Sequence, residues 1–289
     1  MYLNEMKSNT ITYFNKLTVF TGILALLLFL PFFVLAEFNS FAIVSDTHVG
    51  SEDSVYADFI KIIEKKDIKT IIHVGDAIHT PGNKDQWKVF FDITGSDKML
   101  HLAPGNHDIN DKRSLCIYLK FFPKLYHSLS HDDTLFIILN TEIPGETSQI
   151  TGKQLQWLKR ELEKPFRYKF VFLHRPLFPI LSGRGLDRYK DARNELHRLF
   201  VEKGVSLVVS GHDHLYNRST RDGITYIIAA GGGGQSHFPT FNDTRYFFRY
   251  IIGKRENESY SFIVKDLEGD TGDEFNIPES SKYVPEENI

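Results

Sequence analysis

The sequence has one cysteine and no excess of charge of either sign. Cys116 stands alone among 289 residues, so the chain forms no intrachain disulfide and its fold must hold without one. Lysine and arginine total 34 against 37 aspartate and glutamate residues, which gives a formal net charge of -3. This balance provides no general attraction to a polyanion and argues against nucleic-acid binding. With 42% apolar and 25% charged residues, the chain is unlike a disordered or collagenous protein and can bury a sizeable core.

Charge is missing altogether from residues 17–36, LTVFTGILALLLFLPFFVLA. As a helix this stretch would rise about 30 Å, the thickness of the hydrocarbon core of a bilayer. We therefore expect a transmembrane anchor or a signal peptide, preceded by a cytoplasmic segment of residues 1–16. Lys7 and Lys16 precede the stretch and place the N-terminus in the cytoplasm and the rest of the chain outside. The small residue Ala36 fits a cleavage site, so the protein is expected to be either membrane-anchored or secreted after cleavage.

Short apolar runs alternate with amphipathic stretches over residues 37–270, which predicts one α/β domain. The final residues, 271–289, are acidic, contain two prolines and lack periodicity, so we expect a flexible tail there. Strands are predicted at residues 41–45, 70–74, 98–102, 135–139, 169–173, 205–209, 224–229, 246–252 and 259–264. Amphipathic helices are predicted at residues 54–65, 155–162 and 194–201.

Five of the apolar runs end in residues that bind metal ions. In chain order these endings are Asp46-Thr47-His48, Gly75-Asp76, Gly105-Asn106-His107-Asp108, His174-Arg175 and Gly211-His212-Asp213-His214. Ligands bind at the carboxyl ends of strands in layered α/β folds, so these segments are expected to converge on one site. Hard oxygens and imidazoles together form the donor set for Mn, Fe or Zn in hydrolytic centres. Each motif is weak alone, because a single histidine is more often a core or surface residue than a ligand.

The order of the five motifs resembles the calcineurin-like metallophosphoesterase superfamily, which includes purple acid phosphatases and class III cyclic-nucleotide phosphodiesterases. The resemblance covers about residues 40–266 and implies a four-layer αββα sandwich, here preceded by the N-terminal transmembrane or signal helix. It also implies two divalent or mixed-valence transition-metal ions, Mn, Fe or Zn. The implied ligands are Asp46, His48 and His214 for one ion, Asn106, His174 and His212 for the other, and Asp76 as the bridge between them.

The resemblance further implies hydrolysis of a phosphate mono- or diester by a hydroxide that bridges the two ions. His107 resembles the histidine that stabilises the transition state and protonates the leaving oxygen, a role that suits imidazole near neutral pH. Apart from the resemblance, the stretch after His174 is basic, and Arg175, next to a ligand, is its best candidate for binding a second phosphate or an anionic headgroup. The implied partner is a phosphate-ester substrate, with the membrane as a second partner through residues 17–36.

One position departs from the pattern of many phosphatases. Three residues after Asp76, many members carry an aspartate and purple acid phosphatases carry a tyrosine, but this chain has His79. The missing tyrosine argues against a coloured ferric site. His79 resembles the histidine of double-strand-break repair nucleases and would be a second general acid, unless it is a loop residue that points to solvent. Two alternatives to a phosphatase or phosphodiesterase stay open: a nuclease of the same fold, and a catalytically inactive metal-binding scaffold.

Overall fold

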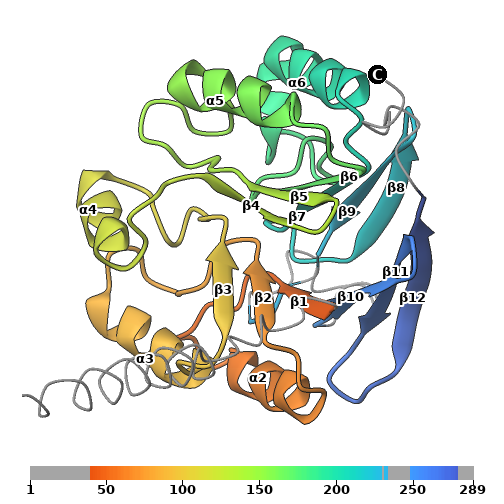
Figure 1. Ribbon diagram of the computed structural model, residues 1–289. Helices are drawn as coiled ribbons and strands as arrows, with labels where there is room; N and C mark the ends of the chain where they lie inside the picture. Colours follow the sequence, from red (N-terminus) through yellow and green to blue (C-terminus); the bar gives the residue numbers. More distant parts are fainter. Residues whose placement is uncertain (1–39, 230, 234–247, 279–289) are drawn as a thin grey trace, which may run out of the picture. The chain divides into compact units, whose positions relative to one another are not determined.

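Two mixed β-sheets form the framework of the described residues, 40–229, 231–233 and 248–278, in the computed structural model (Figure 1). In spatial order, the first sheet consists of β12 (Thr271–Ile277), β11 (Ser259–Lys265), β10 (Tyr250–Glu256), β1 (Ser40–Val44), β2 (Thr70–His73) and β3 (Met99–Leu102). The second consists of β4 (His127–His131), β5 (Thr134–Ile138), β6 (Tyr168–Phe172), β7 (Leu207–Ser210), β9 (Ile224–Ile228) and β8 (Asn217–Arg221).

The central strands of each sheet run parallel. In the first sheet, β1, β2 and β3 are parallel. The pairs β1 with β10, β10 with β11 and β11 with β12 are antiparallel. In the second sheet, β5, β6, β7 and β9 are parallel, and β4 and β8 pair antiparallel at the two edges. The carboxyl ends of several buried strands therefore meet at one end of each sheet.

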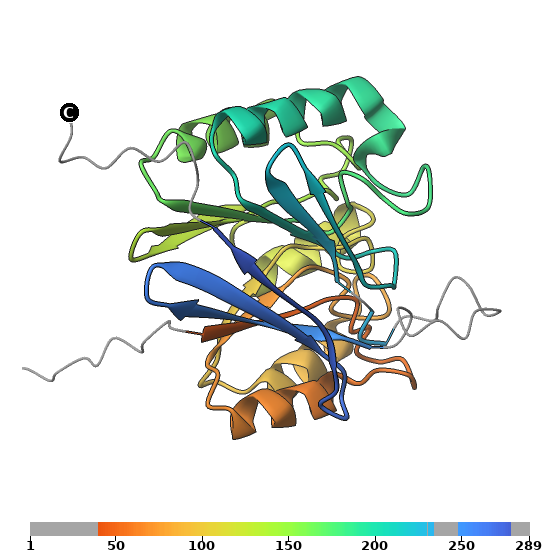
Figure 2. The same cartoon turned by 90° about the vertical axis from the view of Figure 1, so that its right-hand side faces the viewer.

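The two sheets pack face to face with helices on their outer sides (Figure 2). Side chains of a strand alternate between its two faces, so Phe41 and Ile43 of β1 enter the core between the sheets, while Ala42 and Val44 face helices. The helices over the first sheet are α2 (Tyr56–Lys65), α3 (Lys84–Thr94) and α4 (Lys112–Phe121). Those over the second sheet are α5 (Gly152–Leu162) and α6 (Lys190–Glu202), with a short 3-10 turn at Leu186–Tyr189 before α6.

The core between the sheets is rich in aromatic rings. Phe41 of the first sheet meets Phe136 of the second edge to face, with ring centroids 5.4 Å apart. Phe170 and Tyr260 meet across the same interface at 4.9 Å. Each fully buried large apolar side chain contributes about 1.5–3 kcal/mol. This packing fixes the two sheets against each other and with them the loops at their ends.

The structure has the αββα layers that the sequence predicts, with two differences. The predicted tail, residues 271–289, begins with a strand: β12 pairs antiparallel with β11 and buries Phe275 and Ile277 in the core between the sheets. The structure also contains four elements that were not predicted from the sequence: β4, β8, α3 and α4. The predicted anchor or signal segment, 17–36, lies outside the described residues. Among the residues that are described, no helix is long and apolar enough to cross a membrane.

Candidate metal centre

The five predicted motifs lie together at the carboxyl ends of β1, β2, β3, β6 and β7. Backbone hydrogen bonds align the first two loops, since the amide of Asp46 donates to the carbonyl of Gly75 (2.8 Å) and that of His48 to Asp76 (3.0 Å). The amide of His212 crosses from the second sheet to an Asp46 carboxylate oxygen at 3.1 Å. The loops of both sheets therefore build one site.

Six of the predicted ligands converge there in two groups of metal-ligand donors. Asp46, His48, Asp76 and His214 form one group, and Asp76, His174 and His212 form the other. Within each group, one donor atom per residue lies within 4.8 Å of the others. The Asn106 side-chain oxygen lies 3.3 Å from His174 Nε2 and extends the second group. Asp76 belongs to both groups, which is the position of a carboxylate shared by two cations.

The donors are oriented as metal ligands. His174 donates from Nδ1 to the carbonyl of Val74 at 2.9 Å, so its Nε2 faces Asp76 Oδ2 at 3.3 Å. Such a hydrogen bond from the other ring nitrogen is the usual support of a ligating histidine. Both ring nitrogens of His48 are buried and have no hydrogen-bond partner within the described residues. A buried polar atom without a partner costs free energy, so the residues present fit a bound cation.

Strained backbone is concentrated in the same loops. Five predicted ligands have φ between 44° and 73°, a left-handed conformation that residues other than glycine rarely adopt. Each such residue costs on the order of 1–3 kcal/mol and persists where the surrounding structure imposes it, as at functional sites. The five are Asp46, His48, Asp76, His212 and His214.

The glycines of two motifs are required by close packing around the ligands. A Cβ atom on Gly105 would lie 2.2 Å from Asp76 Oδ1. On Gly211, it would lie 1.9 Å from Ser45 Oγ and 2.5 Å from Asp46 Oδ2. No side chain fits at these distances, so the glycines let the ligand loops approach one another.

The electrostatics of the ion-free centre favour positive charge. Burial alone would raise the pKa of Asp46, but the hydrogen bond and charge of His214 lower it below its usual range. Burial would lower the pKa of His174, but the Asp76 carboxylate raises it to about 10, so the ring is protonated near neutral pH. Burial lowers the pKa of His48 to about 4 and that of His212 to about 2, which keeps these two rings neutral. The ion-free centre thus combines buried carboxylates with two neutral imidazoles and the protonated His174, whose proton must leave before the ring can bind a transition-metal ion.

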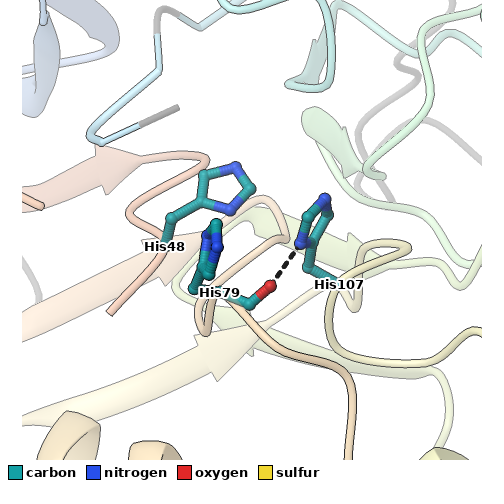
Figure 3. A group of neighbouring side chains, drawn as sticks. All are labelled: His48, His79 and His107. Carbon is teal, nitrogen blue, oxygen red and sulfur yellow. Dashed lines mark hydrogen bonds between the residues drawn. The ribbon is translucent and has the colours of Figure 1, made fainter. Parts of the chain in front are cut away.

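His107 and His79 lie next to His48 (Figure 3), and these three imidazoles form a third group of possible metal ligands. His107 Nδ1 donates to the backbone carbonyl of His79 at 2.5 Å, which leaves its Nε2 available for proton transfer. The ring of His107 lies 4.5 Å from that of His48, centroid to centroid, and the ring of His79 lies 5.8 Å from it. His79 is exposed and His107 half-buried. His79 therefore lies next to the site and is also exposed to solvent. Its role as a second general acid and its role as a solvent-facing loop residue both stay open.

Arg175 also lies in the site, held by a residue that the sequence analysis missed. Its guanidinium makes a two-point contact with Glu142, through Nε to Oε1 (2.7 Å) and Nη2 to Oε2 (3.2 Å). It also donates to Asn106 Oδ1 at 3.3 Å and lies 3.0 Å from His212 Nε2. Arg175 therefore orients two donors of the second group, and phosphate binding by it remains a prediction. Glu142 follows β5 without a motif, so no local signal identifies it.

Two further buried residues hold the ligand loops, and both have a signal in the sequence. The Asp108 carboxylate accepts hydrogen bonds from the amides of Gly105 (2.8 Å) and Ala77 (3.0 Å), and burial raises its pKa to about 7. It is the acid directly after His107 in the third motif. His73 lies 2.9 Å from Thr47 Oγ1, and burial lowers its pKa to about 3. It is a polar residue at the end of strand β2, directly after Ile71 and Ile72.

Curated proteins resemble this chain over about half of its length. The serine/threonine-protein phosphatase CPPED1 of Bos taurus is 27% identical over 187 residues, which cover 58% of this chain and 60% of the relative. Purple acid phosphatase 15 of Arabidopsis thaliana is 25% identical over 175 residues, 52% of this chain and 32% of the relative. The chain thus spans less than two thirds of the length of these relatives.

Solved structures share the fold at low sequence identity. The purple acid phosphatase PPD1 of yellow lupin superposes with a TM-score of 0.69 at 17% identity, over 84% of this chain and 54% of that one. GAP50, described as the anchor in the inner membrane complex of Plasmodium, gives 0.68 at 14% identity, over 86% and 91%. A dimetal phosphatase of Danio rerio gives 0.59 at 13% identity, over 83% and 99%.

A family model identifies the part of the chain that carries the centre. The model of the calcineurin-like phosphoesterases matches residues 40–216, which include every predicted metal ligand from Asp46 to His214. The resemblance inferred from the five motifs is thereby confirmed, and the chain belongs to the calcineurin-like phosphoesterase family.

Proposed function

We propose that this chain is a hydrolase that cleaves phosphate mono- or diesters at a dinuclear metal centre. The observation that carries the proposal is Asp76, whose carboxylate belongs to both donor groups. Bound there, two transition-metal ions would acidify a water molecule as the nucleophile and neutralise the phosphoryl oxygens. Asp46, His48 and His214 would hold one ion, and Asn106, His174 and His212 the other.

His107 would supply the proton to the leaving oxygen. Its Nδ1–H is fixed by the His79 carbonyl, so Nε2 is the atom that carries the transferable proton. The backbone amide of His107 donates to Asp76 Oδ1 at 2.7 Å, so the same residue is tied to the shared carboxylate. This contact keeps the proton donor in register with the two donor groups, where a reacting phosphate would lie.

The phosphatase names of the relatives support hydrolysis of phosphate esters, and the complete donor set argues against an inactive scaffold. A nuclease is the second candidate because the ring of His79 lies 5.9 Å from that of His107, centroid to centroid. A second proton donor at this place would assist the poor alkoxide leaving group of a phosphodiester.

The test is an activity panel on the full-length chain purified in detergent. The substrates are monoesters, diesters, nucleotides, phospholipids and a DNA oligonucleotide, each with Mn²⁺, Fe²⁺, Zn²⁺ or a chelator. We expect metal-dependent hydrolysis of one ester class and its loss in His48→Ala, with Lys61→Ala on α2 as the surface control. Protein that binds two ions but hydrolyses no ester would overturn the proposal in favour of the scaffold.

We further propose that residues 17–36 direct the catalytic domain out of the cytoplasm. They would either stay as a membrane anchor or be cleaved off as a signal peptide. The support is the uncharged run and the two lysines before it. Protease added to intact cells should degrade a membrane-held domain, and the culture medium should contain the domain if the signal is cleaved. Full-length protein found soluble in the cytosol with its N-terminus intact would refute both forms of the proposal.

A further inference from the structure

A cavity with a volume of about 540 Å³ lies on the His79 side of the metal centre. It lies where the loop after His79 enters α3 and meets one face of α4. Thr80, the residue directly after His79, lines it. The ionisable side chains that line it are Lys84, Asp85, Arg113, Cys116 and Lys120.

The lining of this cavity carries unpaired positive charge. Lys84, Arg113 and Lys120 oppose one carboxylate, Asp85, and none of the three forms an ion pair with another residue that the structure describes. The nearby Asp111 interacts electrostatically with Arg113 without forming an ion pair. Its carboxylate instead caps α4, where it accepts a hydrogen bond from the amide of Ser114 at 2.7 Å. Three cations against one anion on a concave surface favour an anionic ligand.

The loop that joins the cavity to His79 is held in place by its own hydrogen bonds. The Asn83 side chain accepts from the amides of Asp85 (3.0 Å) and Gln86 (3.2 Å), and the amide of Thr80 donates to Gln86 Oε1 at 2.7 Å. The first amides of α3 are thus already used by the cap. An anion would be bound by the cationic side chains and not by the end of the helix.

The cavity is joined to the proton donor through a single residue. The His79 carbonyl accepts a hydrogen bond from His107 Nδ1, and the next residue, Thr80, lines the cavity.

We propose that this cavity binds a second anionic group of the substrate, a phosphate or a carboxylate, on the leaving-group side. The placement on that side rests on the proposed function, because it takes His107 as the donor to the leaving oxygen. The natural substrate would then carry at least one anionic group besides the scissile phosphate.

The test compares substrates that differ only in the second anionic group. Hexane-1,6-diol bisphosphate is compared with hexyl phosphate, and a phosphoserine peptide flanked by glutamate with the same peptide flanked by glutamine. The first pair detects a second phosphate and the second a carboxylate. The variant is Lys84→Gln/Arg113→Gln, and the control is Lys88→Gln/Lys112→Gln, which removes the same charge from the same helices outside the cavity.

We expect the full-length enzyme to prefer the doubly anionic member of at least one pair in kcat/KM. Exposed charge pairs are individually weak, so the loss of two cations should reduce this preference by about threefold to tenfold. Hydrolysis of hexyl phosphate should stay unchanged in both double variants. A preference that the control loses as much as the cavity variant would overturn the proposal, because overall charge would then explain it.

Cys116 provides a readout that does not depend on catalysis. It is exposed, lines the cavity and is the only cysteine of the sequence, so a thiol reagent such as iodoacetamide reports on this place alone. Hexane-1,6-diol bisphosphate should slow its alkylation in the presence of a chelator, and less so in Lys84→Gln/Arg113→Gln. Protection without hydrolysis of any ester would support the cavity and contradict the proposed function. Hydrolysis without protection and without a change in preference would overturn the cavity alone.

Discussion

Replacement of the shared carboxylate separates the role of Asp76 in metal binding from its role in the fold. In Asp76→Asn, the amide oxygen can still accept the His107 amide, which lies 2.7 Å from Asp76 Oδ1 in the structure. Asparagine also tolerates the left-handed backbone of this position, where φ is 55°. The amide nitrogen would replace Oδ2, which faces His174 Nε2 at 3.3 Å, and nitrogen of an amide is no metal ligand there. Both donor groups lose one ligand.

The expected effects differ in size. Without the Asp76 carboxylate, which raises the pKa of His174 against the effect of burial, the His174 ring loses its proton and no unpaired charge stays buried. The free energy of unfolding of the ion-free protein should therefore fall by only about 1–2 kcal/mol. Activity should fall more than about 100-fold, because even groups behind the ligands account for 10- to 100-fold. The assays are urea unfolding with a chelator, elemental analysis after dialysis against the metal, and hydrolysis of nitrophenyl phosphate. Asp92→Asn, on the exposed side of α3, is the control. An Asp76→Asn protein with two ions per chain and near-normal activity would refute the shared-ligand reasoning.

Three other variants or conditions test the remaining parts of the centre. His107→Ala should keep both ions but lower turnover of alkyl esters by about 10²- to 10⁴-fold and of nitrophenyl esters much less, and equal losses would show that His107 is not the acid. The affinity of the ion-free protein for metal should rise about tenfold per pH unit between about pH 6 and 8, because His174, whose pKa is about 10, must lose its proton to bind the ion. A metal affinity that calorimetry finds independent of pH would contradict this. Gly211→Ala should displace Ser45 and Asp46, lower the free energy of unfolding in urea by about 1–3 kcal/mol and reduce the metal content. Unchanged stability and metal content would show that the loop can move to accept the methyl group.

The candidate site was predictable where its residues follow buried strands. Asp46 lies two residues after β1 and Asp76 three residues after β2, and an apolar run closely followed by a carboxylate is visible in a single sequence. The parallel order of the strands then brings the motifs to the same end of each sheet. The family resemblance added the division of the ligands between two ions, which stays a prediction. The donor groups around Asp46 and around His174, with Asp76 in both, are the observation that supports it.

The residues that hold the ligands in place were much less predictable. Glu142 binds Arg175 with both carboxylate oxygens, but the two residues are 33 positions apart and neither position is marked by a local pattern that indicates a pair. His73 is visible in the sequence as a polar residue next to an apolar pair, but its contact with Thr47, 26 positions away, is not. Such contacts depend on which loops the fold brings together, so they follow from tertiary structure and not from residue type.

The strands that the sequence analysis missed are all at sheet edges. β4 and β8 are the two edges of the second sheet, and β12 is an edge of the first. Their sequences, HSLSH, NRSTR and TGDEFNI, are polar because one side of an edge strand meets solvent and charged residues there discourage pairing with other chains. β12 shows the consequence most clearly, since Phe275 and Ile277 alone enter the core and five of its seven residues remain outside it. Hydrophobic pattern identifies a strand by what it buries. The strands whose ends carry the metal ligands are therefore detected, the edge strand β3 among them, and the three polar edge strands are not.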